Sequence, residues 1–208
     1  MDQAISVHGI RGFASHIAFN PLKATPVQLP TGGVFVISNS FYQAPKAVTA
    51  ATGYNLRVVE GRLGAKLIAK AHGLPNFLEF TSLYDLQQAL GNKSLQEMQE
   101  VARAALHGEP YTTAELEELL GVEMTQEKLF ADRPAAALVL EKNSSFKCLD
   151  RVLHVYGEAE RVQTFRAVCE EEGEEMEKKL KRVGLKNSKM MVMAVAKENA
   201  SAPPCFTP

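Results

Sequence analysis

The chain has 208 residues, of which 46% are hydrophobic and 23% charged, and its formal net charge at pH 7 is −1. These proportions are typical of a globular protein with a packed core, and the length suits one or two domains. A nearly neutral chain gives no electrostatic reason to expect nucleic acid or an anionic membrane as a partner.

No apolar run approaches the roughly 20 residues that span a bilayer. The first residues also lack the basic and apolar segments of a secretory signal. Three widely spaced cysteines, Cys148, Cys169 and Cys205, favour neither a disulfide framework nor a zinc site. Cysteines used in this way suit a reducing compartment, so we expect a cytoplasmic protein.

The first 40 residues are expected to be extended. Two short apolar runs, AISVHG and ASHIAF, are separated by IRGF, in which Gly12 can form a turn. After the proline-bounded stretch NPLKATPVQLP, two glycines precede VFVIS. This run is apolar on both faces, which predicts a buried strand.

From Tyr54 onward the apolar residues recur with a helical period. They form one apolar stripe of Leu56, Val59, Leu63, Leu67 and Ala71. This stripe predicts a helix that ends near Gly73 and Pro75. The basic residues of the helix lie mostly off the stripe; they are Arg57, Arg62, Lys66 and Lys70. Capping boxes or their near relatives predict three further helix starts, at Ser82-x-x-Asp85, Ser94-x-x-Glu97 and Thr112-x-x-Glu115. The last of these, TAELEELLG, is expected to end at Gly121.

The longest predicted helix runs from about Phe146 to about Glu172, with a stripe of Leu149, Val152, Leu153, Tyr156, Ala159, Val162, Phe165 and Cys169. The acidic and then basic run EEEGEEMEKKLKR that follows indicates a solvated helical surface. The final ENASAPPCFTP is interpreted as an unstructured tail. Strands therefore precede helices, which predicts an α+β arrangement or parts of two domains.

Three residues are candidates for chemistry. Asp2 could act as a general base or orient a hydroxyl nucleophile, as an Asp does in many phosphoryl transfers, although an isolated acid is more often simply solvated. Lys46 follows a proline after the predicted strand, where an ammonium can meet a phosphate, but most lysines are surface residues. Tyr54 precedes a helix and could bind a polar ligand or merely pack. Histidines form no cluster, so no metal site is expected.

Five stretches, in order and with preserved spacing, resemble galactokinase and its N-acetylgalactosamine kinase branch, which are sugar-1-kinases of the GHMP superfamily. They are MDQAIS, FNPLKATPVQLPTGGVFVISNS, KAVTAATGYNLRVVEGRLGAKLIAK, GEPYT with the helix after it, and FKCLDRVLHVYGEAERVQTF. The resemblance covers roughly residues 1 to 170 and implies a GHMP-kinase fold. It implies phosphorylation of galactose, or of N-acetylgalactosamine, by ATP with Mg²⁺.

The resemblance also implies roles for the three candidates. Asp2 matches the active-site aspartate that takes the proton from the anomeric hydroxyl of the sugar or holds that hydroxyl in line with the γ-phosphate. Lys46 matches a position that contacts the nucleotide. Tyr54 matches a sugar-contacting tyrosine and mildly favours galactose over its N-acetylated relative.

The family's N-terminal sugar-gripping signature, its phosphate-binding glycine-rich loop and its last glycine-rich motif do not appear. We therefore expect an incomplete GHMP fold and a partial chain that is inactive and poorly stable alone, from a full-length protein that is monomeric. Residues 1–53 would be the end of the N-terminal domain, 54–187 the mostly helical part of the C-terminal domain, and 188–208 a disordered or foreign tail. The alternative is a non-catalytic, galactokinase-like protein that senses sugar or binds a partner.

Overall fold

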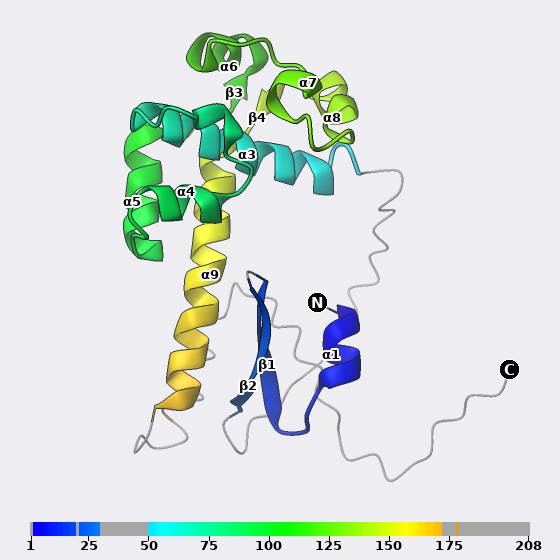
Figure 1. Ribbon diagram of the computed structural model, residues 1–208, viewed down its shortest axis with the longest axis vertical. Coiled ribbons are helices and arrows are strands. Elements are labelled where there is room, and N and C mark those ends of the chain that lie inside the picture. The colour runs from blue at the N-terminus through cyan, green and yellow to red at the C-terminus, as the bar shows by residue number, and fades with distance from the viewer. Residues whose placement is uncertain (1, 20, 30–49, 172–177, 179–208) are drawn as a thin grey trace, which may run out of the picture. The chain divides into compact units, whose positions relative to one another are not determined.

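The computed structural model describes residues 2–19, 21–29, 50–171 and 178 (Figure 1). The chain divides into two compact units. The described residues before position 40 and after position 160 belong to the first unit, and those between belong to the second. The domain limits expected from the sequence, at positions 53 and 187, stay predictions.

The first unit contains helix α1 (Asp2–His8) and an antiparallel hairpin of strands β1 (Phe13–Phe19) and β2 (Leu22–Gln28). Gly12 precedes β1 with a φ of +83°, as expected for the turn predicted there. The hairpin register runs from Phe13 opposite Gln28 to Phe19 opposite Leu22.

One prediction for this unit was wrong. The run AISVHG was expected to be extended, but all of it except Gly9 lies in α1, because a short apolar run fits a helical turn as well as a strand. The proline-bounded LKATPVQ is extended as expected and forms β2. The predicted strand VFVIS lies outside the described residues.

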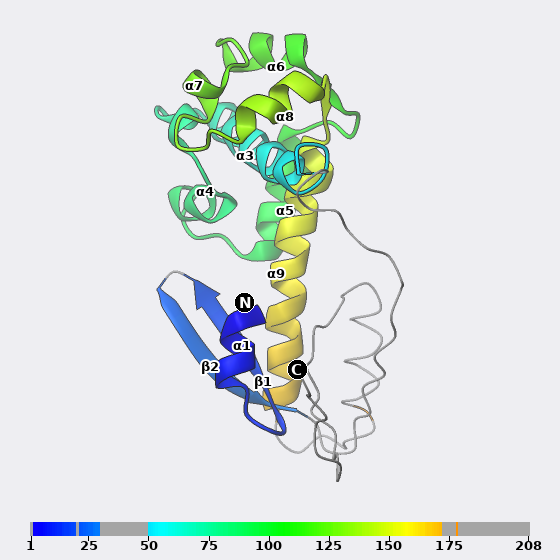
Figure 2. The same cartoon turned by 90° about the vertical axis from the view of Figure 1, so that its right-hand side faces the viewer.

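The second unit is built around helix α3 (Tyr54–Ala71), which contacts α4, α5, α6 and α8 (Figures 1 and 2). The predicted apolar stripe is buried as far as Leu67, whereas Ala71 is exposed. The expectation that basic residues lie off the buried side was wrong for Lys66, which is only 1% exposed, and Glu60 is buried to the same extent. The middle of α3 is therefore enclosed nearly all round, as a helix contacted on several sides must be.

Short elements surround α3. They are the 3₁₀ turn η1 (Phe77–Glu79) and helices α4 (Leu83–Ala89), α5 (Leu95–Ala105), α6 (Thr113–Leu120), α7 (Gln126–Leu129) and α8 (Ala136–Lys142), with a two-residue ladder of β3 (Tyr111–Thr112) and β4 (Ser145–Phe146). All three predicted helix starts are confirmed. The hydroxyls of Ser82, Ser94 and Thr112 each accept a hydrogen bond from the backbone N–H three residues later. Gly121 ends α6 with a φ of +75°.

The long helix α9 (Cys148–Glu170) confirms the predicted one within two residues at each end. Cys148, Val152 and Tyr156 are buried in the second unit, but Val162 of the predicted stripe is 39% exposed. A stripe is buried only where another element lies alongside it, and the sequence of a helix does not specify where that happens. The described residues thus form a mixed α+β structure, and no helix among them is long and apolar enough to cross a membrane.

Candidate functional site

The three candidate residues fall in different parts of the chain. Asp2 is the first residue of α1 in the first unit, and Lys46 lies outside the described residues. Tyr54 is the first residue of α3 in the second unit and is 71% exposed. Their convergence on one substrate stays a prediction, and Tyr54 is the candidate whose surroundings the structure describes.

A tight turn presents Tyr54 to solvent. The backbone N–H of Asn55 donates to the carbonyl of Ala50 at 2.8 Å, and that of Arg57 donates to the carbonyl of Gly53 at 3.2 Å. The first bond occupies a donor that the first turn of a helix leaves without an intrahelical partner, and the second is the first i→i−4 bond of α3. An exposed tyrosine here offers both an apolar ring and a polar hydroxyl to a ligand.

Residues 50–55, hereafter the lead-in segment, are also held by residues much further along the chain. Asn143 Nδ2 donates to the carbonyl of Ala51 at 3.3 Å and to that of Val139 at 2.7 Å. Arg133 Nη2 donates to Asn55 Oδ1 at 3.3 Å. Arg133 and Asn143 lie on either side of α8 in the sequence, so that helix and its flanks fix the segment that presents Tyr54.

A buried carboxylate anchors the next turn of α3. Glu60 Oε1 accepts a hydrogen bond at 3.0 Å from the backbone N–H of Lys147, and Glu60 Oε2 lies 3.0 Å from Arg57 Nη1 and 3.7 Å from Arg151 Nε. A carboxylate that is only 2% exposed requires such partners to offset the loss of its hydration. Glu60 therefore ties α3 to the start of α9.

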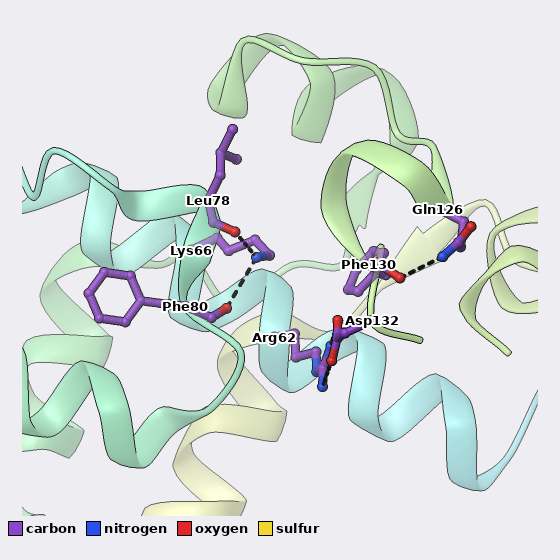
Figure 3. Close-up of polar contacts among 7 residues, drawn as sticks. All are labelled: Arg62, Lys66, Leu78, Phe80, Gln126, Phe130 and Asp132. Carbon is purple, nitrogen blue, oxygen red and sulfur yellow. Dashed lines mark hydrogen bonds and ion pairs between the residues drawn. The ribbon is translucent and has the colours of Figure 1, made fainter. Parts of the chain in front are cut away.

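Further along α3, Arg62 forms a two-pronged ion pair with Asp132, at 2.7 and 2.9 Å (Figure 3). The hydrogen bond from this guanidinium holds the pKa of Asp132 below its ordinary value. Because Asp132 is 54% exposed, the pair adds little to the free energy of unfolding. Its geometry nevertheless fixes the loop that follows α7 against α3.

Lys66 is the buried cation of this unit among the described residues. Its ammonium donates to the carbonyls of Leu78 and Phe80, the latter at 3.1 Å (Figure 3). Burial, with a smaller contribution from the neighbouring Arg62, lowers the pKa of Lys66 to about 8. A lowered pKa can mark a catalytic amine, but this ammonium is committed to two main-chain carbonyls at η1, and its role is to fix that turn.

Among the described residues of the second unit, neither a metal centre nor a reactive thiol is indicated. No three His, Cys, Asp or Glu side chains among the described residues converge as metal ligands would. Burial raises the pKa of the Cys148 thiol, which disfavours the reactive thiolate. Sequence reasoning missed Glu60 and Lys66, since neither stands out from an ordinary helical pattern, and only their enclosure by other elements reveals them.

Comparison with known proteins finds galactokinases as relatives, although no protein-family profile matches the chain. The galactokinase of Dictyostelium discoideum is 36% identical over 174 residues, which are 83% of this chain and 34% of that protein. The galactokinase of Schizosaccharomyces pombe is 30% identical over 192 residues, covering 78% of this chain and 36% of its own length. That of Candida parapsilosis is 47% identical over 72 residues, or 34% of this chain and 14% of the relative. The chain thus spans about a third of the length of the first two relatives.

Proposed function

Since the chain belongs to the galactokinase family, we propose that it takes part in the ATP-dependent phosphorylation of galactose, or of N-acetylgalactosamine, at the anomeric oxygen. Similarity to galactokinases from an amoeba and two yeasts is the observation that supports this proposal. The chain spans about a third of the length of the first two relatives. We therefore assign the proposed activity to a complete polypeptide that contains this sequence.

In the proposed reaction Asp2 takes the proton from the anomeric hydroxyl or aligns it with the γ-phosphate. Lys46 contacts the nucleotide and Tyr54 contacts the sugar. Positioning and charge stabilisation are the main requirements of such a transfer. The exposed place of Tyr54 on a helix held at several points supports its part.

Mg²⁺ would neutralise charge on the phosphates during transfer. Mg²⁺ in such sites is usually held by one or two carboxylates together with substrate phosphates and water, and the proposal assigns none of the described residues to it. The proposal extends to the fold: the described elements are taken as part of a GHMP-kinase fold, in a cytoplasmic protein whose full-length form is monomeric.

Activity can be tested in two proteins. One is the 208-residue chain. The other is a chimera in which this chain replaces the aligned segment of the Dictyostelium galactokinase. Galactose-dependent release of ADP is measured in each, with N-acetylgalactosamine as the competing sugar. We expect turnover in the chimera and none in the chain alone.

Three substitutions in the chimera then test the assigned roles. Asp2→Asn should abolish turnover, and Tyr54→Ala should raise the KM for the sugar. Tyr84→Ala is the matched control, since Tyr84 is a 47% exposed tyrosine on α4, and it should change neither constant. A folded chimera that binds both ligands without turnover would favour the sensing alternative, and one that binds neither would refute the proposal.

A further inference from the structure

Two hydrogen bonds bracket Tyr54 along the chain. One joins Asn143 Nδ2 to the carbonyl of Ala51, 92 residues away, and the other joins Arg133 Nη2 to Asn55 Oδ1, 78 residues away. Ala51 is 5% exposed, so its carbonyl lies in a part of the unit where an unpaired acceptor would be costly. Arg133 and Asn143, hereafter the α8 clasp, thus hold the residues on both sides of the tyrosine.

We propose that the α8 clasp positions Tyr54 for the sugar, so that Asn143 and Arg133 determine sugar affinity without touching the sugar; this inference rests on the function proposed above. The two residues of the α8 clasp flank a helix that is firmly packed in the unit, because Ala136 and Val139 of α8 are fully buried. A binding side chain at the first residue of a helix needs this kind of support from packed structure to keep its geometry.

The chemistry of Asn143 fits this role. Asn143 follows the last residue of α8, and its one amide nitrogen donates both to the carbonyl of Val139 in the last turn and to that of Ala51. An amide NH₂ has two hydrogens, one for each carbonyl. A carboxylate has nearly the same shape but no hydrogen to donate, and it would face two acceptors. Asn143→Asp therefore separates the hydrogen bonds of this side chain from its packing.

Amide hydrogen exchange tests the clasp in the chimera without any substrate. The reporters are the backbone N–H groups of Asn55 and Arg57, which form the turn at Tyr54. We expect their exchange to rise about fivefold in Asn143→Ala, from the loss of the one hydrogen bond that reaches the lead-in segment, at the carbonyl of Ala51, and further in Asn143→Asp. Arg133→Met, which keeps the apolar stem, should act in the same direction as Asn143→Ala.

Gln126→Ala is the matched control. The side-chain amide of Gln126 donates to the carbonyl of Phe130 at 2.7 Å (Figure 3), a bond of the same type that does not involve the lead-in segment. Exchange at Asn55 and Arg57 should stay unchanged in this variant. Unchanged exchange in Asn143→Asp would overturn the inference, and so would an equal rise in the control.

Kinetics in the chimera supply the second readout. Asn143→Ala should raise the KM for galactose about fivefold, by the same lost bond, while kcat and the KM for ATP stay unchanged. A merely structural loss would lower the active fraction and hence kcat instead. An unaltered KM for galactose would overturn the sugar-positioning role. Absence of turnover in the unsubstituted chimera would overturn the proposed function itself, and the exchange measurement, which needs no substrate, keeps the two failures apart.

Discussion

The carboxylate of Glu60, on α3, accepts a hydrogen bond at 3.0 Å from the backbone N–H of Lys147, 87 residues further along the chain. Lys147 lies between β4 and α9, so this single contact joins the helix that begins at Tyr54 to the start of the longest helix. The same carboxylate is paired with Arg57 and Arg151. One buried acid thus connects a helix, a loop and a second helix.

Replacing this acid should be costly. Glu60→Ala removes the acceptor of the Lys147 N–H and the counter-charge of Arg151, and losing one partner of a buried pair typically lowers the free energy of unfolding by about 3 kcal/mol or more. Glu60→Gln keeps an acceptor for Lys147 and should cost roughly half as much. Urea unfolding measures both, and Glu118→Ala at an exposed position of α6 is the control. Equal losses in Glu60→Ala and Glu118→Ala would contradict this account.

Gly64 is the glycine of α3 that lies in closest contact with α9. A Cβ at this position would meet Val152 Cγ2 at 2.5 Å, whereas one at Gly61 would meet only Arg151 Cγ at 3.6 Å, an ordinary contact. Gly64→Ala should therefore lower the free energy of unfolding by about 1–3 kcal/mol through overpacking.

Gly61→Ala is the matched control on the same helix. It should be neutral or stabilise by up to about 1 kcal/mol, because alanine favours helix over glycine. Thermal unfolding of both variants gives the comparison.

Adding Val152→Ala to Gly64→Ala should lower the free energy of unfolding by less than the sum of the two single changes, since the new methyl group fills part of the space that the valine leaves. Strict additivity would show that the two residues do not compete for space.

Lys66 should make the stability of the second unit depend on pH. Its pKa is about 8 in the folded chain and 10.5 ordinarily, so between these values the unfolded chain binds more protons. The free energy of unfolding therefore rises with pH across this window, by up to roughly 3 kcal/mol. Urea unfolding of the wild type and of Lys66→Met from pH 7.5 to 10.5 isolates this effect, since other groups titrate in both. If the free energy of unfolding changed with pH in the same way in both proteins, Lys66 would not have the lowered pKa described above.

Cys148 should resist alkylation until the chain unfolds. Its side chain is fully buried, and burial raises its pKa, so little reactive thiolate forms and reagents have no access. Mass spectrometry after iodoacetamide treatment at pH 8 should find Cys169, which is partly exposed, modified at least about tenfold faster. In denaturing urea the two rates should converge. Rapid labelling of Cys148 without denaturant would mean that α9 leaves its place readily.

Local signals in the sequence predicted much of the second unit. The capping boxes at Ser94 and Thr112 form as predicted, with the hydroxyl and the carboxylate three residues later each bonded to the other's backbone N–H. Such bonds need only neighbours in the sequence, so they are visible without a fold. The stop of α3 before Gly73 and the left-handed Gly121 are local in the same sense. The resemblance to galactokinases likewise came from short stretches in order and is supported by the relatives.

Features that depend on contacts between residues far apart in the chain could not be predicted from the sequence. A short apolar run was expected to be extended but lies in α1, because packing decides between structures that both fit a few residues. Lys66 was expected off the buried side of α3, but other elements enclose it. The surroundings of Tyr54 depend on Asn143 and Arg133, and no pattern in the sequence links residues 92 and 78 positions apart.

The sequence by itself therefore determined the family, the α+β character, the helix starts of the second unit and the identity of Asp2, Lys46 and Tyr54 as candidates. The tertiary structure alone decided which charges are buried, which glycine is required by a neighbouring helix and which residues hold Tyr54 in place. The physical reason is the range of the interactions. Caps, turns and amphipathic stripes are set by residues within one or two turns, whereas burial and long-range hydrogen bonds exist only once distant segments have packed together.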